Sequence, residues 1–168
     1  IGNADKFIKK KEETYEIIKT KYKKYNLNLE QKTALKFLEK SNDKFDVSVL
    51  QGTTGSGKTL IYFELIKKII EKNKQALILL PEIFLTNDFK IRFQNYFGFE
   101  PAIWHSKISL KQKRLIWKSV IKNEIKIIIG ARSSLLLPFK KLGIIIVDEE
   151  HDTSYKQDEG VTYNARDM

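Results

Sequence analysis

The chain has 168 residues, of which 42% are hydrophobic and 31% are charged, so it can bury one packed core and is too apolar to be disordered throughout. The 31 Lys+Arg outnumber the 21 Asp+Glu, and the net charge of +10 favours a polyanionic partner such as nucleic acid or a phosphate-rich ligand. Cysteine is absent and there are two histidines, which excludes disulfides, thiolate zinc sites, cysteine nucleophiles and a histidine-built metal cluster.

The first 26 residues differ in composition from the rest of the chain. They hold eight lysines and a thin stripe of apolar residues at helical spacing, which predicts a solvated helix. This helix is either a linker or the end of an upstream domain, and a direct contact with nucleic acid is the alternative. No signal peptide begins the chain and no apolar run reaches the roughly 18–20 residues that span a bilayer, so we expect a cytoplasmic location and no membrane partner.

From residue 27 onward, short apolar strands alternate with helices. The predicted helices are 30–40, 60–70, 83–97 and 110–121, and the predicted strands are 47–50, 76–80, 102–104, 126–129 and 144–147. The strands do not alternate apolar with polar residues, which indicates burial on both faces. We therefore expect an α/β fold with a parallel sheet and helices on both of its faces.

A glycine-rich loop between the first predicted strand and the next helix satisfies G-x-x-x-x-G-K-[ST] in full. Its residues are Gly52, Thr53, Thr54, Gly55, Ser56, Gly57, Lys58 and Thr59. Glycines let the backbone wrap closely around a phosphate, and N–H groups of the loop and of the helix start point at the anion. Lys58 supplies a positive charge to the β and γ oxygens, and Thr59 supplies a hydroxyl to Mg²⁺. The strand before it and the apolar helix after it favour a nucleotide site over a fortuitous turn.

Carboxylates appear where the last predicted strand ends. Ligand sites of open α/β sheets lie outside the carboxyl ends of the strands, so Asp148 and Lys58 are expected at the same end of the sheet. Asp148 is placed to hold Mg²⁺, and Glu149 to orient and deprotonate an attacking water. Acidic residues after a strand are common, and it is the phosphate loop upstream that favours this interpretation.

Further segments accompany these two motifs in a fixed order. They are 80–86, 104–106, 129–134, 148–152, 154–157 and 163–167. With them, the chain from about residue 27 to residue 168 closely resembles the PriA family of primosomal replication-restart DNA helicases, which are superfamily 2 DExH enzymes. The resemblance implies that residues 27–168 form the helicase ATP-binding domain, a P-loop NTPase domain that is the first RecA-like lobe, here truncated, with ATP and Mg²⁺ as cofactors.

The resemblance also assigns roles to single residues. Gln31 matches the adenine-reading position, and His151 matches the histidine that couples nucleotide state to DNA binding. The residues that match DNA-contacting positions are Pro81, Glu82, Thr86, His105, Arg132, Ser133, Tyr155, Lys156 and Arg166. The last three belong to a segment, 152–167, that matches an aromatic-rich loop sensing single-stranded DNA by stacking on its bases. For each candidate a structural role, such as a helix cap, an ion pair or a packed loop side chain, is the alternative.

The sequence departs from the family pattern in places. Thr53 replaces a valine of the phosphate loop, a nearly isosteric change. Ala131 and Ser134 replace the usual Thr and Ala around Arg132, which weakens the assignment of a hydroxyl contact with DNA there. Asn164 replaces a histidine, so no role is carried to it.

For the intact protein the resemblance implies ATP-driven 3′-to-5′ unwinding at stalled forks and primosome assembly. Its partners would be single-stranded or forked DNA and primosome proteins. Zinc belongs to the full-length family, but this sequence contains no zinc ligands. A second lobe and an arginine finger, which contributes about 10³–10⁵ in rate, are missing, so this chain alone is expected to bind nucleotide weakly and hydrolyse it barely.

Three alternatives stay open. One is another superfamily 2 translocase, RecG-like or an RNA helicase, although the D-E-E-H string argues against a D-E-A-D RNA helicase. A second is a P-loop kinase or small NTPase. A third is a non-catalytic nucleic-acid-binding module, although the intact Lys58, Thr59, Asp148 and Glu149 argue against a decayed site.

Overall fold

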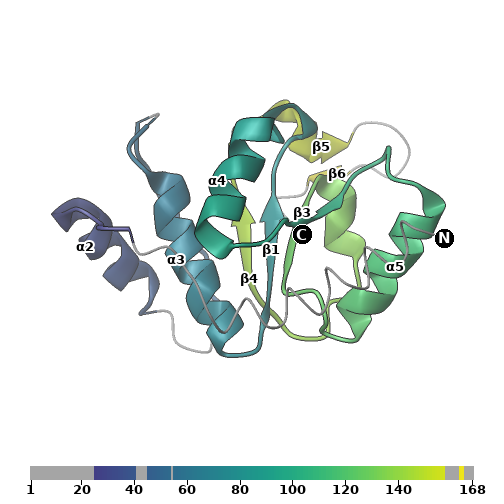
Figure 1. Ribbon diagram of the computed structural model, residues 1–168. Coiled ribbons are helices and arrows are strands. Elements are labelled where there is room, and N and C mark those ends of the chain that lie inside the picture. The colour runs from purple at the N-terminus through teal and green to yellow at the C-terminus, as the bar shows by residue number, and fades with distance from the viewer. Residues whose placement is uncertain (1–24, 41–44, 54, 158–162, 165–168) are drawn as a thin grey trace.

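The computed structural model describes residues 25–40, 45–53, 55–157 and 163–164 (Figure 1). The segment predicted as a linker, 1–26, therefore lies outside the described residues except for its last two. Within the described part of the chain, no helix has both the length and the apolar character that crossing a membrane requires.

A four-stranded parallel sheet forms the centre of the fold. Its strands are β1 (Gln75–Leu79), β2 (Ala102–Trp104), β3 (Ile127–Gly130) and β4 (Leu142–Val147). They lie in the order β2-β3-β1-β4, and each neighbouring pair is parallel. In the middle of the sheet, Leu77 of β1 is in register with Ile128 on one side and Ile145 on the other. The parallel sheet predicted from the apolar runs is confirmed.

Two helices precede β1, one α-helix follows β1 and one follows β2, and a 3-10 turn joins β3 to β4. The helices are α2 (Leu29–Leu38), α3 (Lys58–Glu71), α4 (Asn87–Phe97) and α5 (Leu110–Ile121), with 3-10 turns η1 (Glu82–Phe84), η2 (Arg132–Leu136) and η3 (Thr153–Tyr155) and a two-stranded ribbon of β5 (Lys156–Gln157) and β6 (Tyr163–Asn164). The helix predicted at 83–97 is divided, because Thr86 caps α4 by accepting a hydrogen bond from the Phe89 amide at 3.3 Å.

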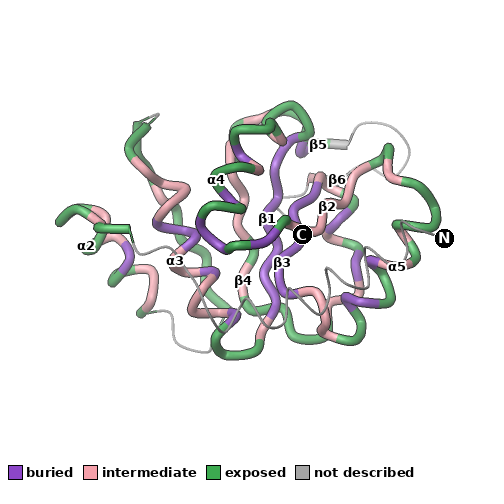
Figure 2. The backbone as a smooth tube through the Cα atoms, in the orientation of Figure 1, coloured by how far each residue is buried: buried purple, intermediate pink, exposed green. Residues whose placement is uncertain are grey.

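Two cores bury the two faces of the sheet. On one face, α3 and α4 pack an aromatic cluster that includes Phe63, Phe93 and Phe97 against Ile78 and Ile129. On the other face, α5 packs with Leu137 and Tyr155 against the alternate residues of the same strands. Figure 2 shows the result: β1 and β3 are buried along their whole length, with covered layers on both sides. The α/β architecture with helices on both faces is confirmed.

The prediction of a strand at 47–50 is wrong. Residues 45–50 have no strand assignment, and Val47 and Val49 are 74% and 78% exposed. A short apolar run forms a strand only where a neighbouring strand pairs with its backbone. The pattern of four residues does not show whether such a neighbour exists. As a consequence β4 is an edge strand among the described residues, and its Ile145 stays 42% exposed.

The central packing gives a direct test. Ile129 is fully buried in the core under α3 and α4, so Ile129→Ala is expected to lower the free energy of unfolding by about 2–5 kcal/mol, through lost apolar burial and the cavity left behind. The matched control is Ile91→Ala on α4, whose side chain is 54% exposed and whose cost should stay within about 0.5 kcal/mol. Urea denaturation followed by circular dichroism measures both, and equal costs would contradict this packing.

Candidate functional site

The glycine-rich loop is held by left-handed glycines at the start of α3. Gly55 and Gly57 have φ values of 81° and 85°, which residues other than glycine rarely adopt. Gly57 is the N-cap of α3 and offers no side-chain cap, so the first amides of the helix keep no side-chain partner there. Open amides at a helix start, together with the helix dipole, favour an anion such as phosphate.

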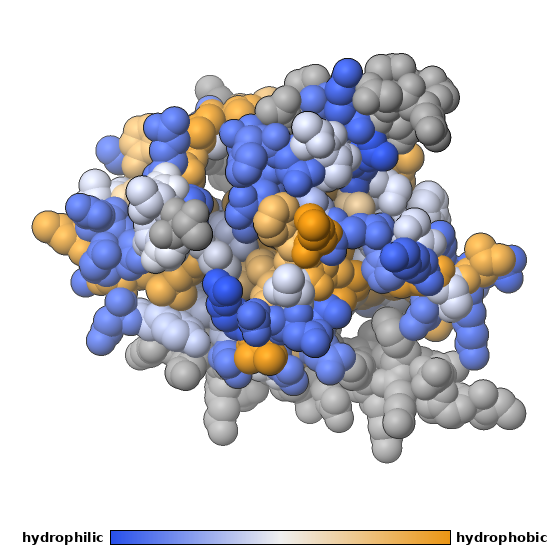
Figure 3. Space-filling view, turned by 90° about the horizontal axis from the view of Figure 1, so that it is seen from above, coloured by the Kyte–Doolittle hydropathy of each residue, from blue (hydrophilic) through white to orange (hydrophobic). Residues whose placement is uncertain are grey.

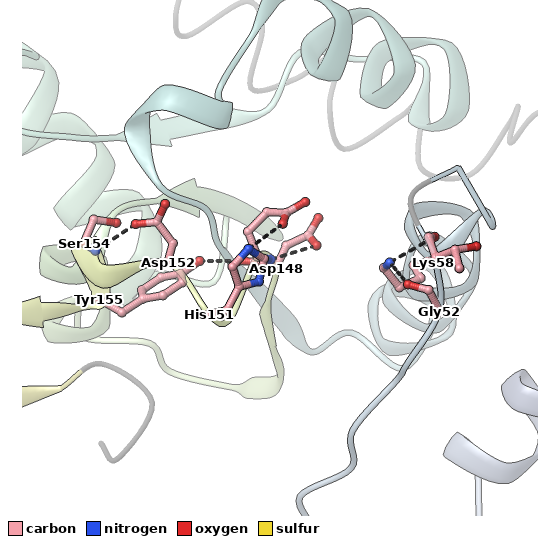
Figure 4. A network of polar contacts seen from close by, with 9 residues as sticks. Gly52, Lys58, Asp148, His151, Asp152, Ser154 and Tyr155 are labelled. Atoms are coloured by element: carbon pink, nitrogen blue, oxygen red, sulfur yellow. Dashed lines mark hydrogen bonds and ion pairs between the residues drawn. The ribbon is translucent and has the colours of Figure 1, made fainter.

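The ammonium of Lys58 lies within this loop. Its Nζ donates hydrogen bonds to the carbonyl of Gly52 and, at 3.3 Å, to the carbonyl of Thr53. Of the eight predicted loop residues, Thr54 lies outside the described residues. The lysine thus bonds to the loop's own carbonyls, and in Figure 4 it lies apart from the group formed by Asp148, His151, Asp152 and Tyr155.

Helix α2 supports the loop through Gln31. Asn28 and Gln31 form a capping box at the start of α2, in which the Gln31 Oε1 accepts from the Asn28 amide at 3.0 Å. The Nε2 of Gln31 donates to the carbonyl of Ser56 at 3.0 Å. A Cβ on Gly57 would stand 2.4 Å from this Nε2, so the amide occupies the space that only a glycine leaves free. The residue predicted to read adenine therefore also braces the phosphate loop.

A buried tyrosine joins α3 to the acidic end of β4. The Tyr62 hydroxyl donates to the Asp148 Oδ2 at 2.8 Å, and the Thr59 hydroxyl is its second side-chain partner. Burial and the negative charge of Asp148 raise the pKa of Tyr62, so the phenol stays protonated and remains a donor. Tyr62 was not among the predicted site residues. Its position three residues after Thr59, on the same helix face, is the signal that could have identified it.

The residues after β4 form a tight, strained turn. Glu149 has a φ of 51°, an uncommon value for a side-chain-bearing residue, and its amide donates to the Asp148 Oδ1 at 3.1 Å. The Nε2 of His151 stands 3.7 Å from the Glu149 Oε2, and the His151 side chain is 75% exposed. Hydrogen bonds from Ser154 lower the pKa of Asp152, which caps η3 and so stays ionised. The predicted Glu149 and His151 therefore face each other beside Asp148.

Magnesium fits the oxygen atoms gathered here. Mg²⁺ prefers hard oxygen ligands and is typically held by one or two protein groups together with phosphates. Thr59 and Asp148 provide a hydroxyl and a carboxylate that share Tyr62 as a partner. Across the described ranges there is no group of three or more His, Cys, Asp or Glu residues suited to holding a metal, so an all-protein metal cage is not part of this arrangement.

A groove of about 290 Å³ opens at the carboxyl ends of β1 and β3. The residues lining it are Pro81, Glu82, Ile83, Ala131, Arg132, Ser154 and Tyr155. Four of the predicted DNA contacts line it, from separate parts of the chain: Pro81, Glu82, Arg132 and Tyr155. The Arg132 guanidinium bonds to the carbonyl of Lys156. Figure 3 views the molecule from above, where hydrophobic residues gather in the middle of a largely hydrophilic surface.

Several predicted DNA contacts already have structural partners. Glu82 Oε1 accepts from the Ser106 hydroxyl at 3.1 Å, and the Trp104 Nε1 donates to the Ser133 hydroxyl at 3.1 Å. The His105 Nδ1 accepts from the Lys107 amide at 3.2 Å. Thr86 is the α4 cap described above. These bonds connect the loops around the groove and match the structural alternatives considered for these residues.

Tyr155 departs from its predicted role. Its ring is 1% exposed and its hydroxyl donates to the carbonyls of Leu79 at 3.0 Å and Asp148 at 2.5 Å. Because a ring must be accessible to stack on a base, Tyr155 supports the floor of the groove and does not present a stacking face. Burial and the charge of Asp148 raise its pKa, which keeps the hydroxyl a donor. Lys156 is exposed at the groove's edge, and Arg166 lies outside the described residues.

Comparisons with known proteins agree on a helicase. Residues 28–168 match the DEAD/DEAH box helicase family. The chain is 48% identical to the replication restart protein PriA of Rickettsia felis over 167 residues, which cover 99% of this chain and 25% of that protein. It is 43% identical to the PriA of Bacillus subtilis over 127 residues, which cover 76% of this chain and 16% of that protein. The resemblance to PriA is confirmed, and the chain spans about a quarter of the length of the relatives it matches first.

Solved structures show the same fold. RecG bound to a three-way DNA junction superposes with a TM-score of 0.68 at 23% identity, covering 95% of this chain and 24% of that one. The DUF1998 helicase MrfA superposes with a TM-score of 0.57 at 22% identity, covering 78% and 22%. These likenesses support the RecA-like α/β architecture.

The loop glycines provide a matched pair of variants. Gly55→Ala and Gly57→Ala both force a left-handed residue, at a cost of about 1–2 kcal/mol, but only at Gly57 would the added methyl displace the Gln31 amide from Ser56. Gly57→Ala is therefore expected to weaken binding of a fluorescent ATP analogue about 3- to 10-fold more than Gly55→Ala does. Equal losses in an equilibrium titration would show that the Gln31 brace contributes nothing to the loop.

Proposed function

Because the chain belongs to the DEAD/DEAH box helicase family, we propose that it is the ATP-binding lobe of a DNA helicase that acts in replication restart. The observation that carries the proposal is the hydrogen bond from Tyr62 to Asp148, which joins the helix that opens at the phosphate loop to the acidic end of β4. A nucleotide-hydrolysing site needs both of these parts at one place. The intact protein then couples ATP hydrolysis to 3′-to-5′ unwinding of forked DNA.

In this proposal each group has one task. The open amides at the start of α3 and the Lys58 ammonium bind the phosphates, and Gln31 meets the adenine while bracing the loop. Thr59 and Asp148 hold Mg²⁺, which neutralises charge on the β and γ phosphates. Glu149 orients the attacking water and accepts its proton. His151 touches Glu149 and so is placed to respond to the state of the nucleotide.

DNA follows the groove at the carboxyl ends of β1 and β3. Arg132 meets a phosphate there, with Lys156 at the edge and the apolar side chain of Ile83, which is 77% exposed, on the wall. The loops held by Glu82 and Ser133 shape this surface. Primosome proteins are proposed as partners of the intact protein, which acts in the cytoplasm; its zinc ligands would lie outside this chain.

Hydrolysis by the intact protein tests the proposal. Lys58→Ala is expected to abolish DNA-stimulated ATP hydrolysis, and Glu149→Gln to lower kcat about 10²–10⁴-fold with little change in nucleotide binding, since it removes a general base. Glu150→Gln is the matched control, as it neutralises the next carboxylate of the same turn. Phosphate release is measured with single-stranded DNA and with RNA. Stimulation by RNA alone would indicate an RNA helicase instead, and equal activity of Glu149→Gln would exclude Glu149 as the base.

The role of Arg132 predicts a salt dependence. If two or three phosphates are bound at this lobe, the logarithm of DNA affinity falls with the logarithm of salt by about 0.7 per phosphate on single strands. Arg132→Gln is expected to make this slope shallower by about 0.7, because one phosphate contact is lost. Lys122→Gln, which removes an exposed charge where α5 ends, ahead of the amino end of β3 and away from the groove, should leave the slope unchanged. Fluorescence anisotropy with a labelled oligonucleotide at increasing salt measures the slope of each variant. A slope that Arg132→Gln leaves unchanged would show that Arg132 binds no DNA phosphate.

A further inference from the structure

We propose that Tyr62 is a positioning residue of the nucleotide site, whose hydroxyl holds the Asp148 carboxylate and the Thr59 hydroxyl in the arrangement that receives Mg²⁺. The inference rests on the proposed function, because it assigns the metal to these same two residues. It adds a third residue that touches neither nucleotide nor metal and acts through both metal-binding groups.

The packing around Tyr62 does not require a hydroxyl. The side chain is 4% exposed on the inner face of α3, and its ring lies edge-on to Phe63 at 5.2 Å between centroids. A phenylalanine would fill the same space and bury no polar atom. A buried hydroxyl costs free energy unless it is hydrogen-bonded, and here Asp148 and Thr59 are its partners. The two hydrogen-bond partners, and not the packing of the core, therefore explain why this residue is a tyrosine.

The Asp148 carboxylate is held at both oxygens. Oδ2 accepts from Tyr62 at 2.8 Å, and Oδ1 accepts from the amide of Glu149 at 3.1 Å. With donors on both oxygens, one from α3 and one from the next residue in the chain, the carboxylate plane has a defined orientation. An ionised carboxylate has about four acceptor sites, so each oxygen keeps capacity for a water bound to the metal.

The direction of the hydrogen bonds suits a metal ligand. A phenol has one proton, and Tyr62 donates it to Asp148, so the contact with Thr59 uses the Thr59 proton. A threonine hydroxyl whose proton points to Tyr62 presents its lone pairs elsewhere. Those lone pairs are what Mg²⁺ needs from Thr59. Outer partners that orient ligands in this way typically contribute about 10- to 100-fold to metal affinity or activity.

The test is the Mg²⁺ dependence of nucleotide binding by this chain. A fluorescent ATP analogue is titrated in EDTA and at increasing Mg²⁺. Tyr62→Phe is expected to bind the analogue as the wild type does in EDTA, and to need about 10- to 100-fold more Mg²⁺ for the same enhancement. Tyr96→Phe is the matched control, because it removes another buried tyrosine hydroxyl from the same core and should leave the Mg²⁺ dependence unchanged.

A second background separates positioning from a general effect on folding. If Tyr62 acts through the carboxylate, Tyr62→Phe should change the Mg²⁺ dependence in the wild type and have little further effect in Asp148→Asn. Equal effects in both backgrounds, or a Tyr62→Phe chain that matches Tyr96→Phe, would overturn this inference and leave the proposed function intact. A wild-type chain whose nucleotide binding does not respond to Mg²⁺ would overturn both.

Discussion

The hydrogen bond between Tyr62 and Asp148 is the contact on which the site depends. It joins the first turns of α3, which carry the phosphate loop, to the last residue before the turn that holds Glu149 and His151. Without it, the loop and the carboxylates would be two features at one edge of a sheet with no defined relation. The Tyr62 hydroxyl lies beside a core of phenylalanines that shields it from water, whereas the Asp148 carboxylate is half-buried.

Asp148 is in fact held from both faces of the sheet. Tyr62 reaches its side chain from the core under α3 and α4, and Tyr155 reaches its main-chain carbonyl from the core under α5. Both tyrosines are buried, and burial together with the Asp148 charge raises the pKa of each, so both remain donors. A residue fixed at its side chain and its backbone is a rigid reference point for the groups around it.

The groove and the acidic turn share Tyr155. Its ring forms part of the groove lining while its hydroxyl bonds to Asp148, so the proposed DNA track and the proposed metal site are connected through one side chain. Around it, Arg132 bonds to the backbone of Lys156, and Glu82 holds Ser106. These bonds explain why polar residues at the strand ends, which sequence patterns mark as nucleic-acid contacts, also organise the loops that carry them.

The sequence by itself determined the parallel α/β fold, four of the five predicted strands and the position of the glycine-rich loop at the start of a helix, because apolar periodicity and the Gly-Lys-Thr pattern are local properties of the chain. It did not determine that 47–50 would stay unpaired, that Tyr155 would be buried, or that Tyr62 would belong to the site. Each of these depends on a partner far away in the chain: a ladder neighbour, the core under α5, the Asp148 carboxylate. Only the tertiary structure decides such pairings, since the free energy of a strand edge or a buried hydroxyl is set by what lies against it.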